Sequence, residues 1–407
     1  MAERDYGIVV YGATGFTGRL VAEYLDRTYR GDATVKWAMA GRSRAKLESV
    51  RDEMGISPDV DLITADAGDP ASLKAMAGSA KVVITTVGPY QLYGEALLAA
   101  CADAGTDYVD LCGEPAWMAQ MIGKYQDAAS ASGARLVFSC GFDSVPFDLG
   151  VWFLQAEAKA SLGAVLPRIK GRVRGMKGTF SGGTAASLTA TIAAVSKDRS
   201  LLKLLTNPFS LCPGFSGPKQ PHSAEAEYDE TAGSWTAPFI MAPINTKNVH
   251  RSNFLAGHPY GADFVYDERM LTGDGEKGEK RARSAARQEK VQNIMLAMAP
   301  TRWILKTFMM PKPGEGPDKE ARETGFYDIL FIGEGADGKV LKASVKGDKD
   351  PGYGSTSKMI SECALCLLLD IDRETTPGGI WTPATAMNGK LVDRLQAKAG
   401  LTFAIES

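Results

Sequence analysis

The sequence predicts an α/β protein in which a doubly wound parallel sheet is followed by a second α+β domain with a mainly antiparallel sheet. Over the first 140 residues, short β-rich apolar runs alternate with segments of helical periodicity, which is the pattern of parallel strands joined by crossover helices. After about residue 150 the chain changes to longer irregular stretches rich in Gly, Pro and Ser. Within them, residues 168–174 alternate with period two, as a half-buried antiparallel strand does.

Each expected strand of the first sheet is a short apolar run without clean alternation, which is typical of strands covered on both faces. Apolar residues at helical spacing fill segments 16–25 and 47–54 between them. Two further helices are predicted from initiation signals, namely Asp69-Pro70 as N-cap and first helical residue, and Pro115 as the first residue of the next helix. The six expected strands are 8–11, 35–40, 60–65, 81–87, 108–111 and 135–139.

Composition excludes several classes of protein. Hydrophobic residues make up 44% and charged residues 23% of the 407 residues, so neither a disordered chain nor a coiled coil is expected. The net charge of -2 provides no field that would hold a nucleic-acid backbone. The longest apolar run, 363–369, is far short of the roughly 20 residues of a membrane-spanning helix. Because the N-terminus lacks a signal-peptide pattern, we expect a cytoplasmic protein with six reduced cysteines and no metal site.

A glycine-rich turn, Gly12-Ala-Thr-Gly15-Phe-Thr-Gly18, lies directly between the first expected strand and the first helix. Glycines permit a tight turn and close approach of the backbone, and N–H groups at a helix start can hold a pyrophosphate. The spacing differs from the commoner GxGxxG, and a purely structural turn is the alternative. The placement of the turn favours a dinucleotide site of the Rossmann type. The residues expected to contact the cofactor are Gly12, Thr14, Gly15, Phe16, Thr17 and Gly18.

The end of the second expected strand indicates which dinucleotide binds. An NAD site usually has an acidic residue there for the ribose 2′-hydroxyl, but no acid occurs between Ala33 and Leu47. A guanidinium can hold a 2′-phosphate instead, with a serine as a neutral donor. Arg42 and Ser43 therefore predict NADP(H) as the cofactor, and a basic loop exposed to solvent is the alternative.

Ligands in such sheets bind beyond the carboxyl ends of the strands, so the residues that follow each expected strand are further candidates. Asp66 fits a contact with adenine, and the chain at Gly88-Pro89 is expected near the nicotinamide ribose. Tyr90 is expected to pack either on the nicotinamide ring or on neighbouring loops. The remaining candidates at strand ends are Val87, Cys112, Gly113, Glu114 and the segment 141–144.

Two common reductase mechanisms find little support. None of the 13 tyrosines has a lysine four residues later, which is the catalytic pair of short-chain dehydrogenases. A nucleophilic cysteine beside a histidine base stays an alternative only if the three histidines, at 222, 250 and 258, fold across to Cys112 or Cys140.

Eight motifs are distributed over nearly the whole chain. They are 12–18, 41–43, 87–90, Cys140-Gly-Phe-Asp-Ser-Val-Pro146, Ser181-Gly-Gly-Thr-Ala-Ala-Ser187, 311–317, Gly352-Tyr-Gly-Ser-Thr-Ser-Lys358 and 382–387. Together they resemble the saccharopine dehydrogenase-like oxidoreductases, and within that family the sequence is most similar to the mycobacterial-type trans-acting enoyl reductases. The resemblance implies NADPH-dependent reduction of a carbon–carbon double bond conjugated to a thioester, in lipid or polyketide synthesis, with the acyl group on a carrier domain.

Two other functions stay open. One is a saccharopine-type reductase or dehydrogenase acting on a C=N bond, although no residue set for an amino-dicarboxylate is recognised. The other is a non-catalytic NADP-binding protein at lipid surfaces, for which the apolar segment 291–310 is the best support. The same segment would serve as a lid, as core or as a dimer interface, so a peripheral membrane contact and a homodimer are both open expectations.

Enoyl reduction requires a hydrogen-bond donor for the developing enolate oxygen and an acid near the α-carbon. Ser181, Thr184 and the amides of Gly182-Gly183 at a helix start suit the first role, and a capped, tightly packed helix is the alternative. Asp143 is expected to be a structural residue or a ribose contact. The candidates for the acid are, in this order, Tyr90, Tyr353 and Lys358.

The alternating strand 168–174 carries four cations, which are expected to project from one face of its sheet. A solvated outer face is one interpretation. Because carrier proteins are typically acidic, a docking face for an acyl carrier is the other. The four cations are Arg168, Lys170, Arg172 and Arg174.

These observations predict that the chain is divided into three parts. Residues 1–147 are expected to form the NADP-binding Rossmann domain, and 148–350 an α+β domain for substrate binding and dimerisation. Residues 351–407 are expected to form C-terminal helices that pack back on the Rossmann domain.

We expect NADP(H) to bind more tightly than NAD(H). Arg42→Ala should weaken the binding of NADPH by about 1.5–3 kcal/mol, since one charge-assisted hydrogen bond to the 2′-phosphate is lost, and should leave NADH binding nearly unchanged. Fluorescence titration of both cofactors measures the difference. Equal affinity of the unaltered protein for the two cofactors would contradict this assignment.

Overall fold

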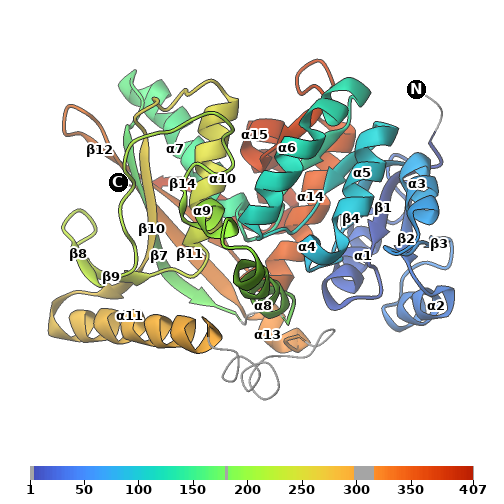
Figure 1. Ribbon diagram of the computed structural model, residues 1–407, viewed down its shortest axis with the longest axis horizontal. Coiled ribbons are helices and arrows are strands. Elements are labelled where there is room, and N and C mark those ends of the chain that lie inside the picture. Colours follow the sequence, from blue (N-terminus) through green and yellow to red (C-terminus); the bar gives the residue numbers. More distant parts are fainter. Residues whose placement is uncertain (1–3, 179–181, 298–315, 407) are drawn as a thin grey trace.

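A computed structural model describes residues 4–178, 182–297 and 316–406, and it contains two seven-stranded sheets that lie side by side (Figure 1). The sheet at the right of Figure 1 contains the N-terminal strands, and the sheet at the left contains the middle of the chain and the C-terminal strand. Helix α7 (Val145–Leu162) leads from the end of the first sheet and packs on the second.

The first sheet is parallel throughout, which confirms the doubly wound sheet that the sequence predicts. Its strands are β1 (Tyr6–Tyr11), β2 (Trp37–Gly41), β3 (Asp61–Thr64), β4 (Ala80–Thr85), β5 (Asp107–Val109), β6 (Arg135–Val137) and β13 (Gly379–Trp381). They lie in the order β13-β6-β5-β4-β1-β2-β3, so the winding reverses between β1 and β4. The sequence predicts six of these strands. It misses β13, because three residues of a distant segment become a strand only by pairing with β6.

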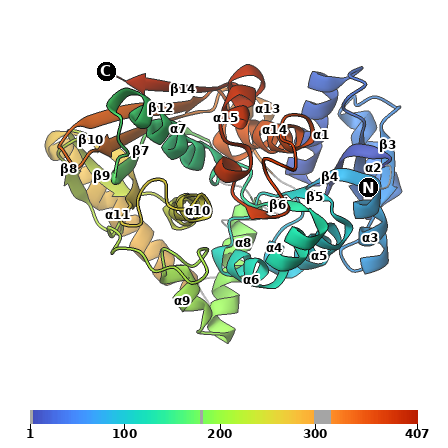
Figure 2. The same cartoon turned by 90° about the horizontal axis from the view of Figure 1, so that it is seen from above.

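Helices cover both faces of the first sheet, which explains why its strands are apolar without alternation. Helices α3, α5 and α6 lie on one face, and α1 and α14 lie on the other (Figure 2). The Asp69 side chain accepts a hydrogen bond from the Ala71 N–H at 3.1 Å and caps α3, and Pro115 is the first residue of α6. The helices of this half are α1 (Phe16–Tyr29), α2 (Arg44–Glu53), α3 (Pro70–Ser79), α4 (Tyr90–Tyr93), α5 (Glu95–Ala104), α6 (Pro115–Ser132), α14 (Thr356–Leu369) and α15 (Pro383–Arg394), with the π-helical turns η1 (Pro351–Ser355) and η2 (Leu395–Ala399).

The second sheet is mainly antiparallel, as predicted, and only β7 and β10 run parallel to each other. Its strands are β7 (Arg168–Lys177), β8 (Glu227–Asp229), β9 (Ser234–Pro238), β10 (Val265–Gly273), β11 (Phe326–Glu334), β12 (Val340–Gly347) and β14 (Leu401–Glu406), in the order β14-β12-β11-β7-β10-β9-β8. Helices α7 and α10 pack against this sheet and against each other. The remaining helices are α8 (Gly182–Lys197), α9 (Leu201–Thr206), α10 (Ala242–Leu255), α11 (Gly275–Ala297) and α13 (Lys319–Glu323).

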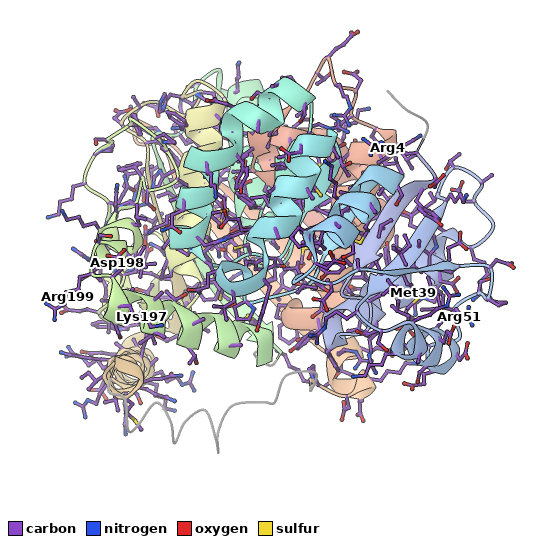
Figure 3. All side chains as sticks on the ribbon, turned by 45° about the vertical axis from the view of Figure 1, so that its right-hand side comes forward. Arg4, Met39, Arg51, Lys197, Asp198 and Arg199 are labelled. Carbon is purple, nitrogen blue, oxygen red and sulfur yellow. The ribbon has the colours of Figure 1, made fainter. Side chains whose placement is uncertain are left out.

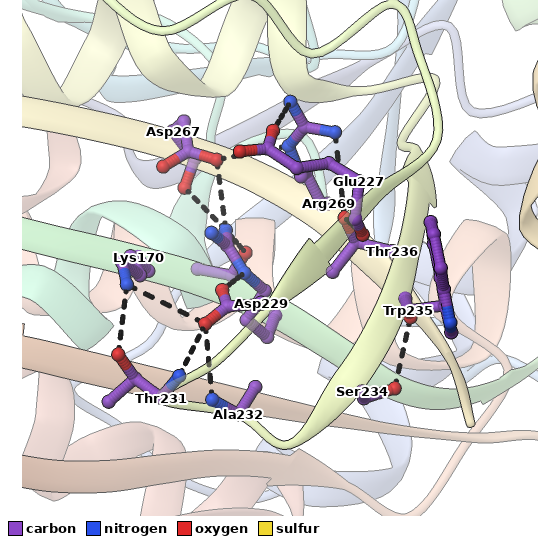
Figure 4. Close-up of polar contacts among 12 residues, drawn as sticks. Lys170, Glu227, Asp229, Thr231, Ala232, Ser234, Trp235, Thr236, Asp267 and Arg269 are labelled. Carbon is purple, nitrogen blue, oxygen red and sulfur yellow. Dashed lines mark hydrogen bonds and ion pairs between the residues drawn. The ribbon is translucent and has the colours of Figure 1, made fainter. Parts of the chain in front are cut away.

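The four cations of β7 do not form an unpaired positive face, because carboxylates of neighbouring strands and of the β8–β9 hairpin pair with them. Figure 4 shows the part of this network around Lys170, Asp229 and Asp267. Arg172 is 3% exposed and lies 2.7 Å from Asp229 and 3.0 Å from Asp267. The full set of pairs is Arg168–Asp267, Lys170–Asp229, Lys170–Glu334, Arg172–Asp229, Arg172–Asp267, Arg174–Asp328 and Arg174–Glu406. This strand therefore offers no unpaired positive face to an acyl carrier.

Residues 351–407 contribute to both sheets, since β13 extends the first and β14 forms an edge of the second. Helix α14 also packs on α1 and on β4. Glu362 of α14 is fully buried and accepts hydrogen bonds from the hydroxyls of Tyr24 and Tyr29 of α1, both at 2.7 Å. Arg394 Nε donates to the same carboxylate at 2.8 Å. Charge-assisted hydrogen bonds thus fix the C-terminal helices to the first sheet.

A buried ion pair lies at the contact between β5, β6 and the end of α14. Arg135 and Asp107 are 3% and 1% exposed, and Arg135 Nε donates to Asp107 Oδ2 at 3.0 Å. The other guanidinium nitrogens donate to the carbonyl oxygens of Leu367 and Ile371 at 2.7 and 2.8 Å. Arg373, the second cation near Asp107, lies 3.2 Å away.

Arg135→Met should lower the free energy of unfolding by about 3–5 kcal/mol, because it removes the principal counter-charge of a buried carboxylate. Urea unfolding followed by tryptophan fluorescence measures the loss. Arg44→Met is the matched control, since it removes an exposed pair with Glu48 at 3.1 Å and should cost less than about 0.5 kcal/mol. Similar losses for both variants would show that the buried pair contributes no special stability.

Candidate active site

A cavity of about 1550 Å³ lies at the carboxyl ends of the first sheet, between this sheet and helices α8, α9 and α10. Pockets for one small molecule typically measure about 300–1,000 Å³, so this cavity has room for a dinucleotide and a second ligand. The charged side chains in its described lining are Arg42, Asp66 and Asp143.

The glycine-rich turn between β1 and α1 lies in the cavity wall where the strand order reverses. Gly12 has a φ of +88°, and a Cβ there would lie 2.7 Å from Val87 Cγ2, so only glycine fits. A Cβ on Gly18 would lie 2.1 Å from the Gly12 carbonyl oxygen, which keeps α1 close to the turn. A Cβ on Gly15 would meet only that same oxygen, at 3.2 Å. The cavity is lined by Gly12, Thr14, Gly15, Phe16 and Thr17, whereas Gly18 acts on the packing beneath.

The cavity continues from this turn over the ends of β2 and β3, where Arg42 and Asp66 lie in its wall. Arg42 makes no ion pair within residues 4–178, 182–297 and 316–406, so its guanidinium is available for an anion. Burial and the charge of Asp66 raise the pKa of the neighbouring Tyr11 to about 12, and Arg42 acts in the opposite direction. Ser43 does not line the cavity, and its Oγ caps α2 by accepting the Lys46 N–H at 3.4 Å. The structure therefore brings Arg42 and Asp66 to one end of the cavity, which the sequence predicts to be the adenosine end, and gives Ser43 a capping role.

The opposite end of the cavity lies over the ends of β4, β5 and β6, and its lining includes Val87, Gly88, Pro89 and Gly113. Cys112 is fully buried, and its N–H donates to Asp110 Oδ1 at 2.9 Å. Burial raises the pKa of the Cys112 thiol well above its usual value. None of the three histidines lines the cavity. The structure therefore does not support a cysteine–histidine mechanism, because the thiolate is disfavoured and no base is near.

Buried Glu114 joins this end of the first sheet to α8. Its carboxylate accepts the backbone N–H groups of Tyr90 and Gln91, both at 2.9 Å, and the Ser187 hydroxyl at 2.7 Å. Gln91 Nε2 also donates to Thr191 Oγ1 at 3.1 Å. The hydrogen bonds Ser187–Glu114 and Gln91–Thr191 thus hold α8 over the cavity, through the start of α6 and through α4.

Two of the three predicted acids have other partners. The Tyr90 hydroxyl donates to the Thr85 carbonyl oxygen at 3.2 Å and accepts the Leu111 N–H at 3.0 Å, so it joins the ends of β4 and β5. Burial raises the pKa of Tyr90 well above its usual value. Lys358 does not line the cavity, and its Nζ donates to the Ala399 carbonyl oxygen at 3.4 Å. These positions argue against Tyr90 and Lys358 as proton donors.

Tyr353 of η1 does line the cavity, and its ring packs edge-on against Phe16 with centroids 4.7 Å apart. The backbone N–H groups of Tyr353 and Gly354 donate to Asp350 Oδ2 at 2.8 and 2.9 Å, so they are not available to a phosphate. The contact with Phe16 places Tyr353 beside the glycine-rich turn.

Asp143 lies where β6 is followed by α7, and its carboxyl faces the cavity near Gly113. A Cβ built on Gly113 would lie 3.9 Å from Asp143 Oδ2. Burial raises the pKa of Asp143 to about 7, without a contribution from a neighbouring charge. The sequence suggests only a structural or ribose contact here, because the apolar surroundings that shift this pKa come from distant segments.

The rest of the cavity is an apolar arm between α8, α9 and α10, which the sequence analysis does not identify because its residues are scattered along the chain. Its far end lies between the end of α8 and α9, and the exposed residues Lys197, Asp198 and Arg199 project into solvent there (Figure 3). The apolar residues of the arm are Met176, Ala186, Ile192, Val195, Leu202, Leu205, Phe239, Ile240, Met241, Pro243 and Ile244.

Several predicted features lie partly or wholly outside the described residues. They include Ser181, the side chain of Thr184, and residues 298–310 of the apolar segment 291–310. Val291 and Ile294, at the end of α11, are exposed.

All six cysteines are buried, and none of them forms a disulfide. Within the described ranges no three side chains form a metal-binding cluster, and each helix is too short or too polar to cross a bilayer.

A parallel sheet with a glycine-rich turn where the strand order reverses, and with an arginine after β2, is the architecture of dinucleotide-binding domains. Comparison with known proteins identifies the cofactor, since residues 8–137 match the saccharopine dehydrogenase NADP binding domain. The protein is therefore an NADP-dependent oxidoreductase. The residues present fit this cofactor, because Gly15 leaves backbone room for the pyrophosphate and Arg42 is available for the 2′-phosphate.

Relatives over nearly the full length define the family. A trans-acting enoyl reductase of Mycobacterium ulcerans is 37% identical, over 97% of this chain and 96% of the relative. A Mycobacterium tuberculosis protein that carries the same name provisionally is 43% identical, over 98% of this chain and 97% of the relative. The chain belongs to the family of the trans-acting enoyl reductases, within the saccharopine dehydrogenase-like oxidoreductases.

Solved structures show the same fold at much lower identity. Apo saccharopine dehydrogenase (L-Glu forming) from Saccharomyces cerevisiae is 13% identical, with a TM-score of 0.53 over 99% of this chain and all of that chain. Homospermidine synthase from Legionella pneumophila, solved with NAD, is 11% identical, with a TM-score of 0.51 over 98% of this chain and 91% of that chain. These likenesses concern the fold alone.

Gly15→Val should fold but lose dinucleotide binding, because a side chain at this position meets little protein yet occupies the space through which a pyrophosphate reaches the backbone. Circular dichroism checks the fold, and NADPH fluorescence titration measures binding. Gly18→Val is the contrasting variant and should fail to fold, since its Cβ would clash with the turn itself. A folded Gly15→Val protein with unchanged NADPH affinity would refute the phosphate site.

Proposed function

We propose that this protein uses NADPH to reduce the carbon–carbon double bond of an enoyl thioester whose acyl chain lies in the apolar arm. The observation that carries the proposal is that one continuous cavity includes both the strand ends at Gly113 and Asp143 and the apolar arm beyond them. A flexible acyl chain would bury its apolar surface there, at about 25 cal/mol for each Å² removed from water.

The names of the relatives support the same reaction, since they are named trans-acting enoyl reductases. With the acyl tail in the arm, its end would lie between α8 and α9. Because the double bond adjoins the thioester, an acyl carrier would present the thioester at the reacting end of the cavity, opposite the arm.

Bound NADPH supplies the hydride for the β-carbon of the substrate, and the chain supplies position and protection. The glycine-rich turn would hold the pyrophosphate, and Arg42 would hold the 2′-phosphate. Glu114 keeps α8 over the reacting end through Ser187, so that water is excluded from the double bond. The amides at the start of α8, at Gly182-Gly183, remain our prediction for the donors to the enolate oxygen.

A saccharopine-type reaction is a weaker proposal for this cavity. An amino-dicarboxylate requires cations at its two carboxylates, and Arg42 is the only cation in the described lining. Arg42 lies at the adenosine end, away from the strand ends at Gly113 and Asp143. The chemistry of the lining therefore favours an uncharged acyl chain over a dicarboxylate.

The test is a screen for NADPH oxidation with three classes of substrate: 2-enoyl thioesters, 3-oxoacyl thioesters, and the imine formed from lysine and 2-oxoglutarate. We expect steady oxidation only with 2-enoyl thioesters, and saturated thioester as the product by mass spectrometry. Oxidation with the imine alone would establish the saccharopine-type alternative. Tight NADPH binding without turnover of any substrate would favour a non-catalytic protein.

Ile192→Glu should raise the KM for a long-chain 2-enoyl thioester at least tenfold, because a carboxylate would be buried against the acyl chain. The KM for a four-carbon 2-enoyl thioester and the Kd for NADPH should change less than twofold. Val340→Glu is the matched control, since Val340 is 46% exposed at the start of β12, outside the cavity lining. A KM that rises equally for short and long substrates would place the acyl chain elsewhere.

A further inference from the structure

We infer that Asp143 is the acid that protonates the α-carbon of the substrate after hydride transfer. This inference rests on the proposed enoyl reduction and assigns a role that the sequence gives to Tyr90, Tyr353 or Lys358. The cavity-facing position of its carboxyl and the engagement of Tyr90 and Lys358 with other partners carry the argument.

The order of the strands places Asp143 at the reacting end of the cofactor. A dinucleotide in a doubly wound sheet lies across the point where the winding reverses, with its pyrophosphate at the first glycine-rich turn. Arg42 follows β2 on one side of that turn, and Asp143 follows β6 on the other side. If Arg42 holds the adenosine phosphate, the nicotinamide lies over β4 to β6, on the same side as Asp143.

The carboxyl of Asp143 is available for a proton transfer. It makes no hydrogen bond or ion pair with any other side chain among residues 4–178, 182–297 and 316–406. The next residue, Ser144, is engaged instead, because its Oγ accepts a hydrogen bond from Asn248 Nδ2 of α10 at 2.8 Å. The start of α7 is thus anchored to α10 while the preceding carboxyl faces the cavity.

The charged and titratable groups on the surrounding elements have partners of their own. On the loop after β5, Asp110 accepts the N–H groups of Cys112 and Ser139, and Glu114 accepts three hydrogen bonds. On α7, Asp148 accepts the Ser252 hydroxyl at 2.5 Å and the Ala384 N–H at 2.9 Å.

Helix α10 also carries Lys247 and His250, and burial together with the charge of Lys247 lowers the pKa of His250. Neither of them contributes to the pKa of Asp143, which burial alone raises to about 7. Both its protonated and its ionised forms are therefore accessible near neutral pH, as an acid that must be recharged in each cycle requires.

The proposed step balances in atoms and electrons. The β-carbon receives a hydride, and the electron pair of the carbon–carbon double bond moves to form an enolate. The enolate then forms a new C–H bond at the α-carbon by taking the proton of the Asp143 carboxyl, and the thioester carbonyl is restored. The remaining carboxylate is protonated by water at the open side of the cavity, and NADPH has been oxidised to NADP⁺.

Asp143→Asn tests the role, because it keeps the size of the side chain and removes the acidic proton. We expect kcat with a 2-enoyl thioester to fall at least 100-fold while the Kd for NADPH changes less than twofold. The wild-type kcat/KM should fall as pH rises through about 7, since the protonated form is the active one, and the variant should lack this pH dependence. Asp143→Glu should recover part of the activity.

If Asp143 is instead a ribose contact, as the sequence suggests, its replacement would change the Kd for NADPH and not kcat. Asp143→Asn would then weaken NADPH binding and leave the pH profile of the saturated enzyme unchanged, and that result would overturn the inference. Asp127→Asn, on the exposed face of α6, is the matched control for loss of one carboxyl and should match the wild type throughout.

A measurement without turnover separates this inference from the proposed function. Infrared difference spectra of the protein without substrate should show a carboxylic acid band that disappears with a pKa near 7 and is missing in Asp143→Asn. Asp110 and Asp148, whose pKa values burial raises to about 7 and about 6, would contribute bands that remain in the variant. If no thioester is reduced by the wild type, the proposed function fails; if thioesters are reduced equally by the wild type and Asp143→Asn, only the role of Asp143 fails.

Discussion

The carboxylate of Glu114 is the interaction on which the cavity depends. It lies at the start of α6, beyond the end of β5, and accepts two backbone N–H groups from the start of α4 and one hydroxyl from α8. A buried carboxylate is costly unless donors surround it, so the three donors and the carboxylate require one another. This requirement sets the position of α8 over the strand ends, and α8 in turn forms one wall of the apolar arm.

The two sheets and their helices contribute different parts of the cavity lining. The first sheet provides the glycine-rich turn, Arg42 and the strand ends, all within a framework of apolar strands covered on both faces. The helices that accompany the second sheet provide an apolar wall without a cation in the described lining. The cavity can therefore hold a charged cofactor and an apolar substrate together, because the first sheet lines it with polar groups and the helices of the second sheet line it with apolar side chains.

The buried ion pairs of this protein stabilise its architecture and do not form its recognition surfaces. On β7, a row of cations that resembles a docking face in the sequence is matched by Asp229, Asp267 and other carboxylates. Likewise, Arg135 joins β5, β6 and the end of α14. In both places a cation without its partner would be expensive to bury, so these pairs specify which strands and helices lie next to each other.

Residue patterns along the chain are enough to predict the alternation of strands and helices, the glycine-rich turn and the arginine after β2, because each depends on residues that are adjacent in the sequence. The folded structure was needed to show that β13 joins the first sheet, that the cations of β7 are paired, and that Tyr90 joins two strand ends while Asp143 faces the cavity. These outcomes depend on which distant segments meet. The pKa of a carboxyl likewise depends on the groups that fold around it, and no local pattern in the sequence records them.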